Sequence, residues 1–506
     1  MSSTTARLSR RGLGALASLP ADPPDAAGIV HLGLGRFHRA HQALYTARAL
    51  ELEPGPWGIV GVARRSRGVV DALRAQDGLY SVLELAHGAS AALVVGVHRE
   101  LLVAADDPLA VVARIADAAT RIVTLTVTER GYSARSATGE LDVAQVRADL
   151  AGSAPCTTIG LLARGLQRRF REHGEPLAIV SCDNVARNGE HVRALVGGFV
   201  GLLADPDAAE LGDWIARSVA FPSTMVDRIV PATQLEHRRR VEQLLGLHDL
   251  APVAAEPFGM WVLEDRFPGG RPCWERAGAV FSDEVQRYEQ LKLRLLNATH
   301  SLIAYLGLLA GERTIAAAIA RPRIRAAAEH LVHAELRPTL DAPAGLDVAR
   351  YVDELFARFD NAALDHRTAT VASDGSLKLP VRITGAVLQL CDRGVVPRAL
   401  ALTVAAFIRC AASPDAYDEH ALGEICDPRR GWLRDLERRS RDSRELVRAV
   451  FDADVFAPAL ADATAFVEAV AELHAALVRG GHRAGVEAAI GRARRSCAAA
   501  IAPAIG

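Results

Sequence analysis

Short apolar runs alternate with helical stretches through the first part of the chain. The apolar runs lie at residues 28–34, 57–63, 121–127 and 177–184. A helical stretch at 36–52 directly follows the first run. Apolar strands separated by helices are typical of a parallel sheet that helices cover on both faces. The pattern predicts an α/β fold with a largely parallel, doubly wound sheet, which further strands at 80–85 and 92–104 extend.

The second part of the chain is rich in alanine and has helical periodicity. The stretches "DVARYVDELFARF" and "RALALTVAAFIRC" are examples. A chain of 506 residues is long for a single core, so two domains are expected. We place the boundary near residue 285, between an α/β domain at 1–285 and a mostly α-helical domain at 286–506.

The first strand leads into a glycine turn of the kind that binds a dinucleotide. In "HLGLGRFHRAHQ", Gly33 and Gly35 stand between the strand and the helix. In such a turn the first glycine allows the tight bend, and the second lets the backbone approach a pyrophosphate at the positive end of the helix dipole. His38 occupies the place of the usual third glycine, so the general pattern is incomplete. The strand-turn-helix context predicts a Rossmann-type dinucleotide-binding domain.

The second strand leaves the choice of dinucleotide open. An acidic residue that holds the adenosine ribose is expected after this strand, but the sequence reads "GVARRSRG". Arg64, Arg65 and Arg67 are able to meet the 2′-phosphate of NADP. They are equally typical of a solvated basic loop. The residues after this strand therefore leave both NAD and NADP possible.

A leucine-rich helical run, "LKLRLLNATHSLIAYLG" at 291–307, carries a lysine, an asparagine and a histidine, Lys292, Asn297 and His300. At about 100° per residue on an α-helix, His300 lies about 80° and Asn297 about 140° from Lys292. All three then occupy one side of the helix. Two interpretations follow, a helix edge with an outward-reaching lysine and a buried structural histidine, or a polar stripe that faces a substrate.

Composition narrows the class of protein. The 59 basic and 60 acidic side chains nearly cancel, so nucleic acid and anionic membranes are not expected partners. Seven scattered cysteines show no metal-like spacing, which favours a reducing compartment. No apolar stretch reaches the roughly 20 residues of a membrane span. Although Arg10-Arg11 precedes a short apolar stretch, we interpret this segment as a leader arm and expect a cytoplasmic protein.

Seven blocks of sequence together resemble one family. In chain order they are "IVHLGLGRFHRAHQALYT", "TLTVTERGY", "SCDNVARNG", "FPSTMVDRIVP", "EPFGMWVLEDRF", "KLRLLNATHS" and "DGSLKLP". These blocks, spread over residues 28–380, resemble the long-chain polyol dehydrogenases, which include mannitol 2-dehydrogenase and fructuronate reductase (mannonate oxidoreductase). The resemblance implies a metal-independent, NAD-linked oxidation of a secondary alcohol in a linear sugar alcohol or sugar acid. It also implies a Rossmann-type domain beside a helical domain, with the active site between them.

The resemblance assigns roles to the polar residues of the motif K-x-x-x-x-N-x-x-H. It makes Lys292 the general base, Asn297 a donor to the reacting oxygen and His300 a residue that orients the substrate. A lysine is a poor base at its ordinary pKa of about 10.4, and burial lowers the pKa. An asparagine opposite Asn297 completes the donor pair in the family, and Asn188 is the expected residue.

The other blocks imply further site residues. The resemblance places the cofactor at Gly33, Gly35, Phe37, His38, Arg39 and Glu129. It implies substrate contacts from Asp227, Asn184, Arg367 and Lys378. Asp227 is a candidate hydrogen-bond partner of Lys292 or of a substrate hydroxyl. Arg367 is suited to a carboxylate because its guanidinium forms a planar fork.

The charged pair of Arg367 and Lys378 favours an acidic substrate. We therefore expect an enzyme of the fructuronate reductase type, active as a monomer or a small homo-oligomer. Mannitol 2-dehydrogenase and mannitol-1-phosphate 5-dehydrogenase are the alternatives within the family. A non-catalytic nicotinamide-binding sensor on the same fold is the alternative from another class.

Overall fold

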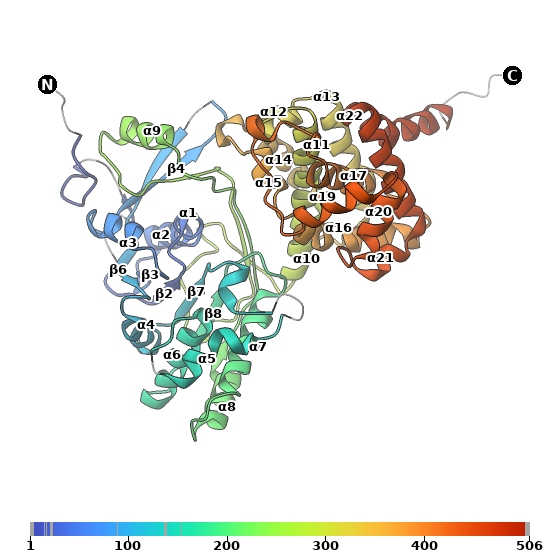
Figure 1. Cartoon of the computed structure of the whole chain (residues 1–506). Helices are drawn as coiled ribbons and strands as arrows, with labels where there is room; N and C mark the ends of the chain where they lie inside the picture. Colours follow the sequence, from blue (N-terminus) through green and yellow to red (C-terminus); the bar gives the residue numbers. More distant parts are fainter. Residues whose placement is uncertain are drawn as a thin grey trace. The chain divides into compact units, whose positions relative to one another are not determined.

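The computed structural model describes residues 5–500, except 15, 17, 21–23, 89, 136–138 and 153, and it describes no side chain at 492–500. The chain forms two compact units, Met1–Tyr288 and Glu289–Gly506, drawn in Figure 1. Each unit is described by itself. Part of the predicted leader arm lies outside the described residues.

The first unit contains the predicted parallel sheet. Among the described residues, the sheet has the strand order β6-β3-β2-β7-β8-β9, and every neighbouring pair is parallel. The bounds are β6 His98–Val103, β3 Ile59–Ala63, β2 Ile29–Leu32, β7 Ile122–Leu125, β8 Leu177–Ser181 and β9 Val219–Ala220. Numbered within the sheet, this is the order 3-2-1-4-5-6 of doubly wound dinucleotide-binding folds. The predicted fold class is confirmed.

Helices cover the two faces of this sheet. The described helices of the unit are α1 Arg36–Ala40, α2 Gln42–Leu52, α3 Arg67–Arg74, α4 Pro108–Ala116, α5 Val143–Ala151, α6 Thr158–Glu172, α7 Asn188–Val200, α8 Ala208–Ser218 and α9 Leu235–Leu245. Successive strand residues point to opposite faces. Accordingly, Ile29 packs in one core cluster with Leu44 of α2, whereas Val30 and Leu32 pack in another with Leu162 of α6.

Two parts of the sequence prediction are wrong. The strands β4 (Tyr80–Leu85) and β5 (Ser90–Val95) pair antiparallel in a separate sheet and do not extend the parallel sheet. The order of this separate sheet is β1-β5-β4-β11, with β1 at Ser18–Leu19 and β11 at Val253–Ala255. The short connection between β4 and β5 allows a hairpin and not the long crossover that parallel neighbours need. The stretch at 36–52 is also two helices, because the backbone of His41 leaves helical geometry at φ −127° and ψ −91°.

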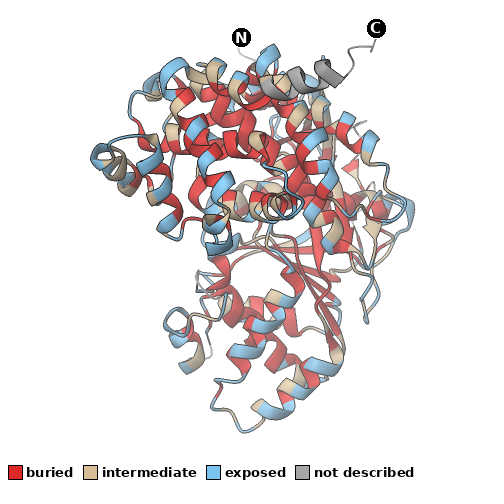
Figure 2. Cartoon of the chain, turned by 90° about the vertical axis from the view of Figure 1, so that its right-hand side faces the viewer, coloured by how far each residue is buried: buried red, intermediate tan, exposed pale blue. Residues whose placement is uncertain are grey.

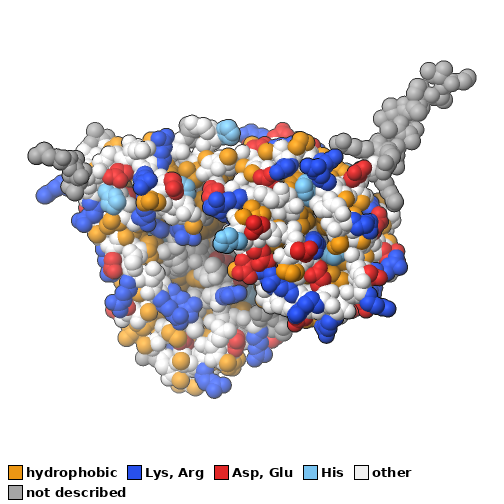
Figure 3. All heavy atoms as spheres, turned by 45° about the horizontal axis from the view of Figure 1, so that its top comes forward, with side chains coloured by type: hydrophobic (Ala, Val, Ile, Leu, Met, Phe, Trp, Pro, Cys, Tyr) orange, Lys and Arg blue, Asp and Glu red, His pale blue; other side chains and the backbone are white. Residues whose placement is uncertain are grey.

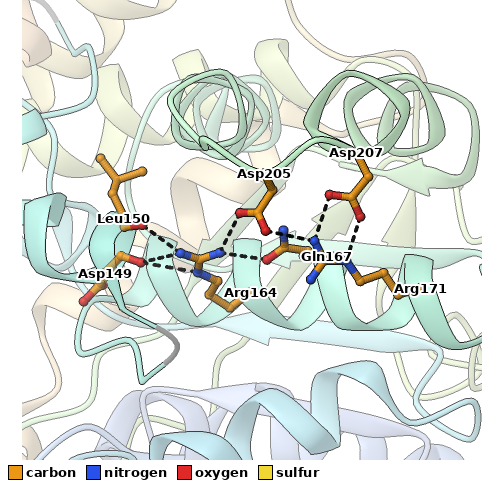
Figure 4. A network of polar contacts seen from close by, with 7 residues as sticks. All are labelled: Asp149, Leu150, Arg164, Gln167, Arg171, Asp205 and Asp207. Carbon is orange, nitrogen blue, oxygen red and sulfur yellow. Dashed lines mark hydrogen bonds and ion pairs between the residues drawn. The ribbon is translucent and has the colours of Figure 1, made fainter.

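A polar network ties α6 to the segment that precedes α8 (Figure 4). Arg171 forms ion pairs with Asp207 at 2.6 Å and with Asp205 at 2.9 Å. Arg164 donates to the backbone carbonyl of Asp149 at 3.1 Å. These side chains are partly exposed, so each pair contributes little stability by itself, but together they fix the helix layer on one face of the sheet.

The second unit is helical, as predicted. Helix α10, Val285–Leu291, contains the boundary between the two units, and the described helices that follow it are a π-helix at Lys292–Ala298, α11 Thr299–Leu309, α12 Ile315–Ile319, α13 Pro322–His330 and a second π-helix at Leu331–Leu336. They continue with α14 Val348–Phe359, α15 Thr368–Ala372, α16 Gly375–Asp392, α17 Arg398–Ala412, α18 Glu419–Leu422, α19 Arg430–Arg439, α20 Ser443–Asp452, α21 Pro458–Asp462 and α22 Thr464–Ala500. Figure 2 shows buried residues on the helix faces that meet other helices.

Three general features complete the description. Six cysteines are free thiols, and the side chain of Cys497 lies outside the described residues. No helix in the described part of the chain is both long and apolar enough to cross a membrane. Basic and acidic side chains are interspersed over the face drawn in Figure 3.

Candidate functional site

The glycine turn after β2 has the geometry that its sequence predicts. Gly33 has φ +111°, and an added Cβ would lie 2.1 Å from the backbone oxygen of Thr126. Thr126 follows β7, the strand beside β2 at the point where the strand order reverses. The close approach of the two backbones therefore allows no side chain at residue 33. An added Cβ at Gly35 would meet no atom closer than 3.5 Å, so that residue faces open space.

A cavity of about 710 Å³ lies at this carboxyl edge of the sheet. Its lining includes Gly35, Phe37, Arg39, Ser66, Thr126, Thr128, Asp183 and Asn184. Ligands of doubly wound sheets bind in this crevice, at the strand-order switch. The residues present fit a dinucleotide, because the glycine turn leaves room for a pyrophosphate at the start of α1.

His38 supports the glycine turn from the interior. Its ring is fully buried and stacks on His31, with ring centroids 3.4 Å apart. Its Nε2 lies 3.1 Å from Nε2 of His98. His31 in turn contacts the backbone oxygen of Gly33 through Nε2 at 3.1 Å. This position suits a residue that positions the turn and not one that touches a ligand.

Asp183 is a site residue that the sequence analysis missed. Its Oδ2 and Oδ1 accept hydrogen bonds from the backbone N–H groups of Val127 and Thr128, both at 2.9 Å. Tyr132 donates its hydroxyl to the same carboxylate at 2.7 Å. Asp183 therefore holds the loop after β7, where Thr128 has the unusual φ of +64°, against the end of β8. A carboxylate directly after a strand was the available signal.

The other predicted residues of the first unit differ in their surroundings. Glu129 is exposed in a short 3₁₀ helix, and Asn184 is exposed at the cavity. Asn188 is buried and donates its side-chain N–H groups to the backbone oxygens of Asp183 and Thr224, at 3.1 and 3.0 Å. Both amide hydrogens of Asn188 therefore join the β8 end to β10.

Asp227 ends β10 (Thr224–Asp227), which pairs with β12 (Met260–Leu263). Its side chain is buried. The Asp227 charge is one of the groups that raise the pKa of Tyr45, although burial of the phenol is the largest cause of that shift, to about 12. Asp227 thus belongs to a buried polar group of the first unit.

The motif of the second unit lies on a π-helix and not on the α-helix assumed from the sequence. The π-helical turn spans Lys292–Ala298. In a π-helix the backbone hydrogen bond connects residue i with residue i+5. Residue i+5 therefore lies one turn above residue i, where residue i+4 lies in an α-helix. Lys292 and Asn297 are five residues apart. The extra residue in the turn therefore brings Asn297 over Lys292, where an α-helix would put it about 140° away.

The three polar residues of this motif have different environments. Lys292 and His300 are buried, and Asn297 is half-buried. Among the described residues, the side-chain amide of Asn297 has no hydrogen-bond partner, and Nε2 of His300 is buried without one. The His300 ring packs between Phe359 and His366, with centroids 5.3 and 4.8 Å away. These polar groups remain available to a ligand.

Burial and neighbouring cations keep His300 and His366 uncharged. Burial is the largest cause that lowers the pKa of His300 well below its ordinary value, and nearby His366, Arg382, Arg358 and Lys378 lower it further. Burial, with Arg358 and Lys378, lowers the pKa of His366 to about 4. At neutral pH His300 is therefore a neutral hydrogen-bonding group.

The two cations predicted to bind a carboxylate are placed differently. Lys378 of α16 donates to the backbone oxygen of Ser373 at 2.8 Å, pairs with Asp374 at 3.7 Å and is one of the charges that act on His300. Arg367 instead donates its Nε to Asp365 at 3.1 Å and lies partly exposed before α15. Because Asp365 partly neutralises the Arg367 guanidinium, the structure does not favour Arg367 for this role.

The described residues contain no group of three or more His, Cys, Asp or Glu side chains arranged to hold a metal ion.

The loop after β3 carries the arginines that the sequence analysis considered for NADP. Arg64 and Arg65 are exposed, whereas Arg67 forms an ion pair with Asp106 at 2.6 Å. The edge of the cavity near β3 is therefore basic.

The sheet order, the glycine turn and the cavity define the first unit as the nucleotide domain of a dinucleotide-dependent oxidoreductase. Comparison with known proteins identifies the family. A family model described as the mannitol dehydrogenase Rossmann domain matches residues 27–276, and one described as the mannitol dehydrogenase C-terminal domain matches residues 284–478. The chain belongs to the mannitol dehydrogenase family, which confirms the predicted resemblance and the predicted oxidoreductase class.

Individual relatives cover most of the chain. D-mannonate oxidoreductase of Escherichia coli (strain K12) is 40% identical over 79% of this chain and 82% of its own length. Polyol:NADP oxidoreductase of Gluconobacter oxydans (strain 621H) is 40% identical over 72% of this chain and 78% of its own. The solved structure of Pseudomonas fluorescens mannitol 2-dehydrogenase, a ternary complex with NAD and D-mannitol, is 33% identical with a TM-score of 0.83 and covers 95% of this chain and 99% of that one.

Gly33→Ala tests the glycine turn. The added methyl group clashes with the backbone after β7, and the positive φ adds strain, so we expect affinity for NADH to fall about tenfold or more. Titration of NADH fluorescence measures it. Gly68→Ala on α3, where an added Cβ meets no atom within 4 Å, is the matched control and should bind normally. Equal affinity in both variants would contradict the role of Gly33.

A second prediction concerns Arg64 and Arg65. If these guanidinium groups meet a 2′-phosphate, the double change Arg64→Ser/Arg65→Ser should weaken NADPH binding about tenfold, since hydrogen bonds to charged groups are strong. NADH binding should change little. The same fluorescence titration with both dinucleotides decides the point, and an equal effect on the two would show that the arginines are only a solvated loop.

Proposed function

We propose that the chain is an NAD-dependent oxidoreductase of the D-mannonate oxidoreductase (fructuronate reductase) type, which interconverts a linear sugar acid and its keto form. Membership of the mannitol dehydrogenase family and the D-mannonate oxidoreductase relative support this substrate class. The single observation that carries the catalytic part of the proposal is the π-helical turn that brings Asn297 over Lys292. A lysine is able to take a proton, and an asparagine is able to donate a hydrogen bond.

In this proposal each residue of the motif has one task. A dinucleotide held at the glycine turn would supply the acceptor for the hydride of the substrate C–H bond. Lys292, uncharged at the start, takes the hydroxyl proton on Nζ, so that the C–O bond becomes a carbonyl. Asn297 donates an N–H to the oxygen on which negative charge develops. Neutral His300 hydrogen-bonds the reacting or the neighbouring hydroxyl and fixes its orientation.

The roles of the first-unit residues follow from their partners. Gly33, Gly35 and Phe37 are proposed to hold the dinucleotide at the cavity, which buried Arg39 also lines. Glu129 is proposed to contact the cofactor from the 3₁₀ helix after β7. Asn184 and Asp227 are proposed to contact substrate hydroxyls. Asn188 is proposed as the second donor beside Asn297, a role for which it has to give up one of its bonds to a backbone oxygen.

Mannitol 2-dehydrogenase activity is the second candidate, and the likeness to the Pseudomonas fluorescens enzyme over nearly the whole chain favours it. A non-catalytic nicotinamide sensor is disfavoured because Lys292, Asn297 and His300 are all present. The free cysteines fit a reducing compartment, and we propose the cytoplasm.

Lys292→Ala tests the catalytic assignment. Loss of a positioned proton acceptor should lower kcat by about a hundredfold to ten-thousandfold, while NADH affinity stays within about twofold. The assay is NADH consumption with fructuronate, tagaturonate, fructose and fructose 6-phosphate. Near-normal turnover of a folded Lys292→Ala variant would refute the assignment. If the wild-type enzyme reduces only fructose, mannitol 2-dehydrogenase replaces the proposed activity.

Metal independence is a further prediction. Lys292 supplies the proton transfer and Asn297 the stabilisation of the oxygen that a zinc ion supplies in other alcohol dehydrogenases. Activity should therefore survive prolonged dialysis against EDTA without loss. A loss that added Zn²⁺ restores would contradict the proposal.

A further inference from the structure

Arg382 of α16 lies against the motif helix of the second unit. Its Nη1 donates to the backbone oxygen of Asn297 at 3.2 Å and to the hydroxyl oxygen of Ser301 at 2.7 Å. The Arg382 charge also lowers the pKa of His300. The guanidinium is therefore close to two of the three residues that the proposed mechanism uses.

This guanidinium keeps unused hydrogen-bond donors. Within the described residues, Arg382 has no carboxylate within ion-pair distance, and its Nε and Nη2 have no hydrogen-bond partner. Burial lowers the pKa of Arg382, and the one neighbour that opposes this shift is Tyr305. By contrast, buried Arg228 pairs with Glu84 at 2.8 Å. A half-buried cation without a counterion is costly unless an anion binds beside it.

A second cation shares the same helix face. Lys378 and Arg382 are four residues apart on α16, so their side chains are neighbours on one face. Lys378 pairs with Asp374 at 3.7 Å, which offsets part of its charge, whereas Arg382 has no such acidic neighbour among the described residues. Both cations lower the pKa of His300, so an acidic group on the substrate would meet an uncompensated positive charge at Arg382.

We infer that Arg382 binds the terminal carboxylate of the substrate and thereby selects sugar acids over neutral sugars. The edge formed by Nε and Nη2 is a planar fork that matches the two oxygens of a carboxylate. Arg382 takes the role that the sequence suggested for Arg367, whose Nε is held by Asp365. The inference takes the reaction from the proposed function, on which it rests, and adds Arg382 as the residue that recognises the charge of the substrate.

Arg382→Gln is the test. Glutamine retains an N–H for the Asn297 oxygen but removes the charge and the fork. We expect KM for fructuronate and tagaturonate to rise roughly ten- to a hundredfold, with KM for fructose changed less than about twofold and NADH affinity unchanged. Arg382→Lys, which keeps the charge without the fork, should recover part of the loss. Arg393→Gln at the exposed end of α16 is the control and should resemble the wild type.

Three kinetic outcomes overturn the inference. Equal losses on acid and neutral substrates would make Arg382 a structural support of the turn. Unchanged kinetics would exclude contact with the substrate. A selective loss in Arg367→Gln, with none in Arg382→Gln, would return the role to Arg367. If Arg382→Gln does not fold, an unaltered acid preference in Arg382→Lys overturns the inference instead. Fructose 6-phosphate separates a carboxylate site from a phosphate site, and stronger dependence of that substrate on Arg382 would also overturn it.

Calorimetric binding of D-mannonate and D-mannitol separates this inference from the proposed function. Tight mannonate binding that Arg382→Gln abolishes supports the inference even if no substrate is turned over, a result that would refute the proposed activity alone. Turnover of fructose without any mannonate binding would overturn the inference and leave the family-level activity intact.

Discussion

The π-helical turn at Lys292–Ala298 decides which polar side chains of the second unit can act together. In an α-helix, residues five apart point in different directions, and a base and an oxygen-stabilising donor at that spacing would serve different places. The inserted residue brings Asn297 over Lys292 and leaves His300 at the start of α11. The Asn297 backbone oxygen, at the point where the π-turn returns to α-helix, accepts hydrogen bonds from the Ser301 hydroxyl and from Arg382.

The sheet of the first unit could be predicted because buried parallel strands appear in a sequence as short apolar runs that alternate with helices. β2, β3, β7 and β8 are apolar along their length, and Gly33 marks the turn where β2 meets β7. The separate sheet of β4 and β5 could not be predicted in the same way. Their apolar residues match a buried strand of any sheet, and pairing depends on partners such as β11 that lie far away in the sequence.

The candidate site could be predicted as a set of residues but not as a geometry. Lys292, Asn297 and His300 followed from the motif, yet a sequence pattern cannot distinguish an α-turn from a π-turn, because one inserted residue leaves the apolar periodicity nearly intact. The place of Asp183 after a strand marks it as a candidate, but the sequence does not show that its carboxylate accepts hydrogen bonds from the backbone after β7, a segment far away in the chain. Arg367 and Arg382 look alike in the sequence, and only their partners, Asp365 in one case and the Asn297 oxygen in the other, separate them.

The candidate site of the second unit combines a neutral histidine with several cationic side chains. Arg358, Lys378 and Arg382 lower the pKa of His300, and a carboxylate bound at Arg382 would offset part of that effect. Burial is the largest cause of the shift, however, and it remains when an acid binds. In the proposed complex His300 would therefore stay uncharged, with one nitrogen that donates and one that accepts. In the proposed mechanism, Arg382 recognises the charge of the substrate and His300 orients its hydroxyl.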